Sequence, residues 1–233
     1  MGKNFEYTGG DILEILEDAK NYNAYLIQLI NKAAIKNKKK NKTYVDFGAG
    51  TGTFAKMLSL PSGSELICVE LDDEQRESMQ DKGLKTNKSI EKVKNIDVLY
   101  SLNVFEHIED DGGVMKTVAK NMSSGGVVLI YVPANQSLYS SMDKLVEHYR
   151  RYDKKRLRNI TEDAGLEILD LRFVDPLGYF AALIYKIFDK GDGKISPLGV
   201  KLFDRFVFPI SKLIEPLTKN FLGKNLVITA VKR

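Results

Sequence analysis

The sequence predicts a doubly wound α/β fold with a mostly parallel sheet. Short apolar runs alternate with helical patterns between residues 43 and 174, and a glycine-rich turn follows the first run. A chain of 233 residues, 43% of them hydrophobic, suffices for one sizeable core. We therefore expect a single domain over residues 1–233.

The expected elements follow in order along the chain. Strand-like runs occupy 43–47, 65–70, 95–102, 125–132, 167–174 and 225–232. Helical patterns lie at 54–58, from Asp72 onward, at 111–121 and between Asp153 and Gly165. Apolar residues at helical spacing over 11–35 predict one broken helix or two short ones. Residues 1–42 thus hold N-terminal helices and a basic connector, and residues 43–174 form the core.

Residues 175–224 form a helical insertion before the last strand, which spans 225–233. The insertion is rich in Phe, Leu and Ile, contains four prolines, and places lysines at the borders of apolar faces. Such segments suit a lid, a dimer surface or shallow attachment to an anionic membrane. We expect a lid or a dimer element first, because apolar helical faces are usually buried in protein. The chain is then a monomer or homodimer, with peripheral membrane contact through 175–224 as the alternative.

Composition narrows the classes of protein. The 35 basic and 31 acidic residues give a net charge of +4, which identifies no partner. Cys68 is the single cysteine, so an internal disulfide and a paired-cysteine zinc site are excluded, and we predict no metal. The longest apolar stretch, 176–185, is about half of what a membrane-spanning helix needs. We expect a cytoplasmic protein that could also be peripheral to a membrane.

The turn after the first strand carries the strongest functional signal. Residues 45–52 read Val-Asp-Phe-Gly-Ala-Gly-Thr-Gly, and Glu70 ends the second strand twenty residues past Gly50. Ligands of open parallel sheets bind at the carboxyl ends of strands, and a carboxylate there can accept hydrogen bonds from both hydroxyl groups of a ribose. The order of these features predicts a cofactor that contains a nucleoside.

Glycine spacing selects among such cofactors. A dinucleotide site needs a third glycine where Thr53 stands, so a nicotinamide oxidoreductase is a weaker alternative. The G-x-x-x-x-G-K-[ST] loop of nucleotide hydrolases is also missing from the sequence.

What remains resembles the class I S-adenosylmethionine-dependent methyltransferases, in which an acid precedes glycines at alternate positions. Asp46, Gly48, Gly50 and Gly52 match that pattern. The segment NVFEHIEDD, residues 103–111, is similar to the family's segment after the fourth strand, and 125–152 resembles the fifth strand and substrate loop of a bacterial small-molecule branch. The resemblance implies a seven-stranded Rossmann-like sheet with an antiparallel last strand. It also implies S-adenosylmethionine as cofactor and S-adenosylhomocysteine as product.

The same resemblance implies a set of cofactor-binding residues. These are Tyr22, Asp46, Gly48, Ala49, Gly50, Gly52, Glu70, Leu71, Ser89, Ile90, Leu102, Asn103 and His107. Asp46 would organise the amino group of the cofactor, Glu70 would hold its ribose, and Leu71 would pack on its adenine. Many relatives place an acid near Ser89, and the sequence departs somewhat from that pattern here. Tyr22 could equally be a core aromatic, and for His107 a hydrogen bond to backbone beneath the site is favoured over contact near the reacting methyl.

The acceptor side is expected on the loop after the fifth strand. A hydroxyl acceptor must lose its proton, and His148 is the candidate base, with Glu147 or Asp143 to orient it. Its alternative role is to pack the loop. Tyr149 and Arg150 are further candidates for the acceptor. Arg150 and Arg151 could clamp a phosphate or carboxylate, or pair on the surface with Glu147, Glu162 or Asp163.

The sequence therefore predicts a methyltransferase acting on a small molecule such as a sugar, a glycan or a lipid-linked metabolite, with O-methylation favoured. One alternative is a nucleic-acid methyltransferase, which the lysines at 38–40 favour. Enzymes that methylate base amino groups typically carry two prolines after the fourth strand, where this chain has Asn103-Val104-Phe105-Glu106. The other alternative is a non-catalytic S-adenosylmethionine-binding protein that acts in a complex.

Overall fold

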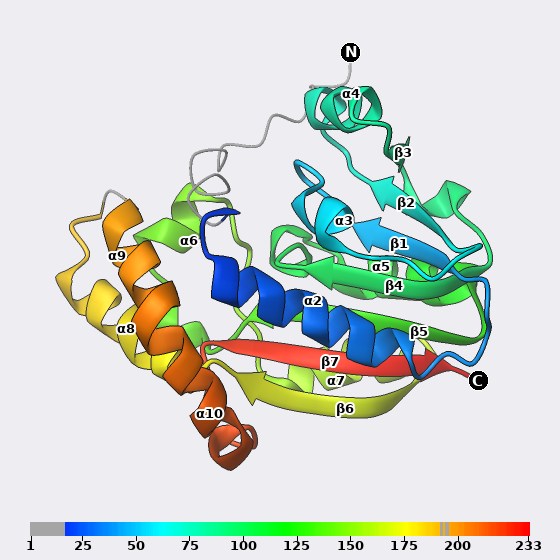
Figure 1. Cartoon of the computed structure of the whole chain (residues 1–233). Coiled ribbons are helices and arrows are strands. Elements are labelled where there is room, and N and C mark those ends of the chain that lie inside the picture. The colour runs from blue at the N-terminus through cyan, green and yellow to red at the C-terminus, as the bar shows by residue number, and fades with distance from the viewer. Residues whose placement is uncertain (1–16, 192, 194–195) are drawn as a thin grey trace.

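The computed structural model describes residues 17–191, 193 and 196–233 (Figure 1). Part of the predicted N-terminal helical region, residues 11–16, lies outside the described residues. Asp18 and Ala19 are not helical, and α2 begins at Lys20, so the part of the predicted helical region from Lys20 onward is confirmed.

A seven-stranded mixed sheet forms the centre of the molecule, which confirms the predicted fold class. The strands are β1 (Thr43–Phe47), β2 (Glu65–Val69), β3 (Lys85–Asn87), β4 (Ile96–Leu102), β5 (Met122–Pro133), β6 (Leu166–Val174) and β7 (Asn225–Lys232). Their order across the sheet is β3-β2-β1-β4-β5-β7-β6. β7 is antiparallel to both neighbours, and the other pairs are parallel, as expected. The three-residue β3 is the strand that the sequence pattern did not locate.

Most of the described α-helices lie where helical spacing predicted them, but the helix at Ser141–Leu145 lies in the segment expected to be the loop after the fifth strand. They are α2 (Lys20–Ala34), α3 (Thr53–Met57), α4 (Asp73–Asp81), α5 (Asp111–Asn121), α6 (Ser141–Leu145), α7 (Lys154–Glu162), α8 (Pro176–Phe188), α9 (Pro197–Leu202) and α10 (Phe208–Thr218). Shorter helical turns are η1 (Ile90–Lys92), η2 (Phe105–His107), η3 (Gln136–Leu138) and the π-helical η4 (Phe203–Val207). The Asp72 and Asp153 side chains accept backbone N–H bonds at the starts of α4 and α7, as N-caps do.

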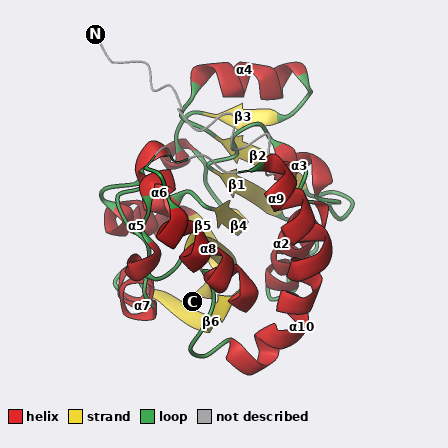
Figure 2. Ribbon diagram, turned by 90° about the vertical axis from the view of Figure 1, so that its left-hand side faces the viewer, coloured by secondary structure: helices red, strands yellow, loops and turns green. Residues whose placement is uncertain are grey.

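Helices cover both faces of the sheet (Figure 2). α5 and α7 pack on one face, where Met115, Val118 and Leu157 join the larger core cluster. α2 and α10 pack on the other, where Leu26 and Phe208 belong to a second cluster. Every residue of β4 is buried, as expected for a central parallel strand covered on both faces.

The carboxyl ends of the parallel strands meet at one edge of the sheet, and α6, α8 and α9 lie at that end (Figure 1). This arrangement brings the glycine turn after β1, the end of β2, the segment after β4 and the loop after β5 to the same edge. Within the described part of the chain, no helix is long and apolar enough to cross a membrane.

Candidate functional site

The glycine turn is fixed by backbone conformation and by one carboxylate. Gly48 and Gly50 have φ angles of 75° and 55°, which L side chains rarely adopt, and a Cβ on Gly48 would lie 2.3 Å from the Val104 side chain. Glu70 accepts a hydrogen bond from the Gly50 N–H at 2.8 Å. The same carboxylate accepts from the N–H groups of Leu71 and Asp72, at 2.8 and 3.1 Å. The ends of β1 and β2 are thereby held together.

Asp46 lies under this turn with unused hydrogen-bonding capacity. Its side chain is buried, and the Oδ2 atom has no hydrogen-bond partner among the described residues. Burial raises the pKa of Asp46 to about 7, and the nearby charge of Glu70 acts in the same direction, while the Tyr100 hydroxyl lowers it. A buried carboxylate oxygen without a partner is costly, and a ligand ammonium group would satisfy it. This orphaned oxygen fits the amino group of S-adenosylmethionine.

The other predicted cofactor residues lie around the same edge. Leu71 is 58% exposed next to Glu70, as a platform for a flat ring would be, whereas Ala49, Ile90 and Leu102 are buried. Ser89 caps η1, and its hydroxyl accepts a hydrogen bond from the Glu91 N–H at 3.2 Å. The Ile90 side chain belongs to the core, and its backbone oxygen already accepts a hydrogen bond from the Asn121 side chain at 2.8 Å.

Tyr22 and Asn103 approach each other from different elements. The Tyr22 hydroxyl lies 3.1 Å from the Tyr131 hydroxyl, and its ring packs on Phe208. Asn103 is also a hydrogen-bond neighbour of the Tyr22 hydroxyl, and it leaves β4 with a φ of 54°. Tyr22 is therefore packed against the core and also lies next to a predicted cofactor residue, so the two roles offered for it are compatible.

His148 forms a hydrogen-bonded pair with Asp143. Its Nδ1 lies 2.8 Å from Asp143 Oδ1, and Asp143 is buried. Two hydrogen bonds from Arg151, both 2.9 Å long, hold the same carboxylate, and these interactions keep the pKa of Asp143 well below its usual value despite burial. Because the ionised Asp143 carboxylate can only accept a hydrogen bond, it favours the tautomer with the proton on Nδ1, in which Nε2 is free to accept a proton. Asp143, and not the exposed Glu147, orients the ring.

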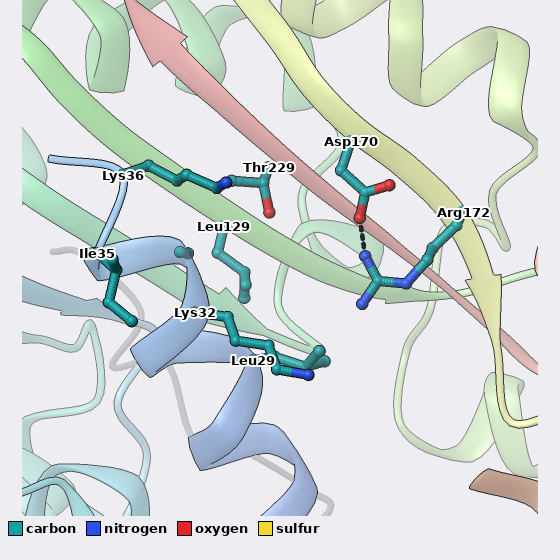
Figure 3. A pocket seen from close by; sticks show the side chains of 9 residues that line it. Leu29, Lys32, Ile35, Lys36, Leu129, Asp170, Arg172 and Thr229 are labelled. Carbon is teal, nitrogen blue, oxygen red and sulfur yellow. Dashed lines mark ion pairs between the residues drawn. The ribbon is translucent and has the colours of Figure 1, made fainter. Parts of the chain in front are cut away.

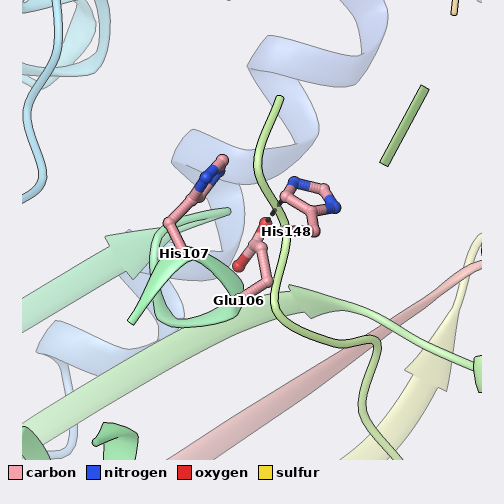
Figure 4. Close-up of side chains that lie close together, drawn as sticks. All are labelled: Glu106, His107 and His148. Carbon is pink, nitrogen blue, oxygen red and sulfur yellow. Dashed lines mark ion pairs between the residues drawn. The ribbon is translucent and has the colours of Figure 1, made fainter. Parts of the chain in front are cut away.

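Glu106 is a site residue that sequence reasoning missed. It is fully buried in η2, four residues after the end of β4, and neither carboxyl oxygen has a hydrogen-bond partner outside its own residue among the described residues. Its Oε1 lies 3.8 Å from His148 Nε2 (Figure 4). Burial raises the pKa of Glu106 to about 8, so the carboxyl is protonated at neutral pH. The residue lies in the short segment after an apolar strand, and nothing in its local pattern showed that its side chain turns inward.

His107 packs edge-on against His148, with ring centroids 4.5 Å apart. Burial and the neighbouring His148 lower the pKa of His107 to about 4, although a hydrogen bond with the Val146 backbone opposes this shift. The ring is therefore neutral at physiological pH. The bond to backbone agrees with the structural role that the sequence favoured for His107.

Glu106, His107 and His148 have ligating atoms within 4.8 Å of one another. Two ligand atoms of a tetrahedral zinc ion, each about 2 Å from the metal, lie roughly 3.3 Å apart. Glu106 Oε1 and His148 Nε2 are 3.8 Å apart, which is farther than that. Such a group could contract around a divalent cation, but we assign no metal to it.

Replacing Glu106 with glutamine is expected to stabilise the protein at alkaline pH. Because the folded-state pKa is about 8, against an ordinary value of 4.5, the stability that this group contributes is lost as pH rises toward 8. A neutral amide avoids this loss, so Glu106→Gln should be more stable than the natural protein by up to about 5 kcal/mol at pH 9, and should gain little at pH 5. Urea unfolding at both pH values measures the difference. The exposed Glu109→Gln is the control, and an equal gain there would show that burial is not the cause.

Arg150 and Tyr149 differ in their surroundings. The Arg150 guanidinium donates to the backbone oxygens of Ile108 and Glu109 and lies 3.3 Å from an oxygen of Asp111. Arg150 thus ties the loop after β5 that carries His148, which we call the acceptor loop, to the segment after β4. Its acidic partner is Asp111 and not Glu147, Glu162 or Asp163, which the sequence suggested. Tyr149 is 55% exposed, and its ring stacks with the Arg150 guanidinium.

A cavity of about 360 Å³ lies elsewhere, between the end of α2 and the sheet (Figure 3). It is lined by Leu29, Lys32, Ala33, Ile35, Lys36, Leu129, Asp170, Arg172 and Thr229. None of these is a predicted cofactor or acceptor residue, so this cavity is separate from the site at the carboxyl edge.

The fold and the carboxyl-edge site define a class of protein, and comparison with known proteins agrees. Residues 19–171 match the family model described as "Methyltransferase domain", and the chain belongs to this family. It is a class I S-adenosylmethionine-dependent methyltransferase, with S-adenosylmethionine as its cofactor. No curated protein sequence matches the chain.

Solved structures share the fold at low sequence identity. One, from Galdieria sulphuraria and proposed to be a sarcosine dimethylglycine methyltransferase, has a TM-score of 0.60 and 16% identity over 91% of this chain and 85% of its own. A possible histamine N-methyltransferase from Thermotoga maritima has a TM-score of 0.60 and 13% identity over 96% and 95%. Phosphoethanolamine N-methyltransferase 2 from Haemonchus contortus, in complex with S-adenosylmethionine, has a TM-score of 0.59 and 17% identity over 99% and 54%.

Proposed function

We propose that this methyltransferase transfers a methyl group to a hydroxyl oxygen of a small molecule, such as a sugar, a glycan or a lipid-linked metabolite. The observation that carries the proposal is the 2.8 Å contact between His148 and Asp143. A base is needed when the acceptor is a hydroxyl, because its proton must leave around the time of attack. The structural relatives named for sarcosine, histamine and phosphoethanolamine support a small acceptor.

The cofactor side of the proposal rests on two carboxylates. Asp46 would hold the amino group through its unpartnered oxygen, and Glu70 would bind the ribose hydroxyls while keeping the Gly50 N–H in place. Leu71 would cover the adenine, and Tyr22 with Asn103 would close the methionine side. Bound S-adenosylmethionine supplies a methyl group already activated by its sulfonium.

On the acceptor side, His148 would take the hydroxyl proton on Nε2. Asp143 fixes the ring orientation and stabilises the imidazolium that forms. Tyr149 is available to contact the acceptor, and Arg150 positions the loop through its bonds to the segment after β4. The buried surroundings of Glu106 and His107 keep water away from the reacting atoms.

The test of this function is a mass-spectrometric screen. The purified protein is incubated with S-adenosylmethionine and a panel of sugars, glycans and extracted lipid-linked metabolites. We expect a product heavier by one methylene group, with the new methyl on oxygen. Transfer exclusively to nucleic acid or to amines would refute the proposal.

Asp46 makes cofactor binding depend on pH. Its pKa of about 7 means that the carboxylate loses its charge as pH falls from 8 to 6, and with the charge goes its attraction for an ammonium group. We expect S-adenosylmethionine to bind about tenfold more weakly at pH 6 than at pH 8. Asp46→Asn should bind weakly at both values when measured by calorimetry. An unaltered pH profile in this variant would show that another group is responsible.

A further inference from the structure

The insertion exposes an unusual amount of apolar surface. Eleven of the seventeen large apolar side chains that are exposed among the described residues belong to it. One stripe runs along α8 and another along α9, η4 and α10. Together they consist of Phe180, Ile184, Ile187, Phe188, Leu198, Leu202, Phe206, Ile210, Leu213, Leu217 and Phe221. We name these residues the apolar face.

Helical periodicity makes each stripe continuous. Successive members of the second stripe are three or four residues apart from Leu198 to Phe221, so they follow one side of consecutive helical turns. The opposite side of α10 carries Phe208 and Ser211, which are buried against the rest of the chain. The apolar face is therefore the outer surface of an amphipathic layer. Monomeric proteins rarely leave so large an apolar surface without a partner.

The charges of the insertion point to the kind of partner. The exposed ionisable side chains described between residues 176 and 223 are all basic: Lys186, Lys190, Lys201, Arg205, Lys212 and Lys219. Lys201 pairs with Asp18, which lies outside the insertion.

The three described acids of the same segment are all bound within the chain. Asp204 accepts the N–H groups of Asn21 and Tyr22, and Glu215 accepts the Tyr25 hydroxyl. Asp189 accepts the backbone N–H and the hydroxyl of Ser141. The surface offered outward is thus apolar and cationic.

An anionic bilayer complements this surface better than a second copy of the chain does. In a symmetric dimer each apolar face would meet the same excess of cations, and like charges brought together across an interface disfavour association. Lysine is also depleted in protein interfaces. Lipid headgroups supply negative charge, and the acyl region accepts the apolar side chains.

The insertion also contacts the acceptor loop. Lys186 Nζ donates to the Ser137 backbone oxygen, and Asp189 holds the first turn of α6, the helix that carries Asp143. On the other side, Asp204 caps α2, the helix that carries Tyr22. A surface bound by the apolar face would therefore lie next to the elements that form the acceptor site.

We infer that the apolar face docks this protein onto the surface of an anionic lipid membrane. Phe188, Leu213 and Leu217, each more than 75% exposed, enter the boundary between headgroups and acyl chains, and the surrounding cations contact the headgroups. Together with the proposed function, this docking presents the acceptor site to lipid-linked molecules. The docking itself requires neither cofactor nor acceptor.

Vesicle co-sedimentation tests the inference without cofactor or acceptor, so a failure of the proposed function would leave it untouched. The full chain should sediment with vesicles of equal phosphatidylglycerol and phosphatidylcholine, and roughly tenfold less with phosphatidylcholine alone. Leu213→Asp with Leu217→Asp should reduce binding at least roughly tenfold. Lys190→Gln with Arg205→Gln and Lys219→Gln should reduce both binding and its dependence on salt.

The control is Ile35→Asp with Leu169→Asp, which changes two exposed apolar residues outside the insertion and should bind vesicles as the natural protein does. Retained affinity for S-adenosylmethionine shows that each variant folds. Failure of the natural protein to bind phosphatidylglycerol vesicles would overturn the inference. Equal loss in the control pair would also overturn it. So would a stable dimer that Leu213→Asp with Leu217→Asp converts to monomer, because a second copy would then cover the face.

Discussion

Replacing His148 with glutamine is expected to slow methyl transfer by about 10²- to 10⁴-fold, the range that a positioned base contributes. Affinity for S-adenosylmethionine should stay nearly unchanged, because His148 lies on the acceptor loop and not on the glycine turn. Single-turnover kinetics with the acceptor found in the screen measure the first quantity, and calorimetry measures the second.

Variants of two neighbouring acids decide how the base is oriented. Asp143→Asn should also slow turnover and shift the pH profile, since the amide cannot stabilise an imidazolium as the carboxylate does. Glu147→Gln changes an exposed residue of the same loop and should react as the natural protein does. If His148→Gln retains full turnover, the histidine only packs the loop, and the oxygen-directed mechanism fails.

Replacing Glu70 with alanine should weaken cofactor binding by roughly 1 to 3 kcal/mol. Two effects contribute: the ribose hydroxyls lose an acceptor, and the Gly50 N–H loses the bond that holds the glycine turn. Glu70→Gln separates them in part, because the amide oxygen can still accept from the Gly50 N–H, whereas the negative charge and the acceptor for the Leu71 and Asp72 N–H groups are lost. Calorimetric titration of the three proteins with S-adenosylmethionine gives the affinities.

The control for this series is Glu77→Ala, an exposed acid on the neighbouring helix α4. Its affinity should equal that of the natural protein. Unchanged affinity in Glu70→Ala would reject the place assigned to Glu70, whatever the outcome for other residues.

Local sequence signals sufficed for much of the fold. The caps at Asp72 and Asp153 and the apolar runs of β1, β2, β4 and β5 are set by neighbours in the chain, so periodicity and capping located them. β3 has three residues with polar side chains, too few for a period of two to appear. Its place in the sheet follows from pairing with β2, which no local pattern records.

The acceptor loop shows what sequence could not determine. Glu147 and Asp143 both stand near His148 in the chain, but only the folded loop turns Asp143 inward, onto His148 and Arg151. Arg150 finds Asp111, 39 positions earlier, through tertiary contact. The burial of Glu106 is likewise a property of the fold.

The insertion is a second case in which the sequence pattern alone does not determine the surroundings of the side chains. Its amphipathic pattern was visible in the sequence, and we expected protein to cover the apolar side chains. Within the described residues these side chains remain exposed. The side of the helices that faces the rest of the chain carries the buried residues Phe208, Ser211 and Asp204 instead. Periodicity shows that a helix has an apolar face but not whether a partner or the chain itself covers it.

A crystal structure of the protein with S-adenosylhomocysteine tests the central claim most directly. We predict the nucleoside between the turn at Gly48–Gly52 and Glu70, with the ribose hydroxyls on the Glu70 carboxylate and the amino group near Asp46. Binding of the compound elsewhere, for example in the cavity beside α2, with the glycine turn closed by side chains, would contradict the account.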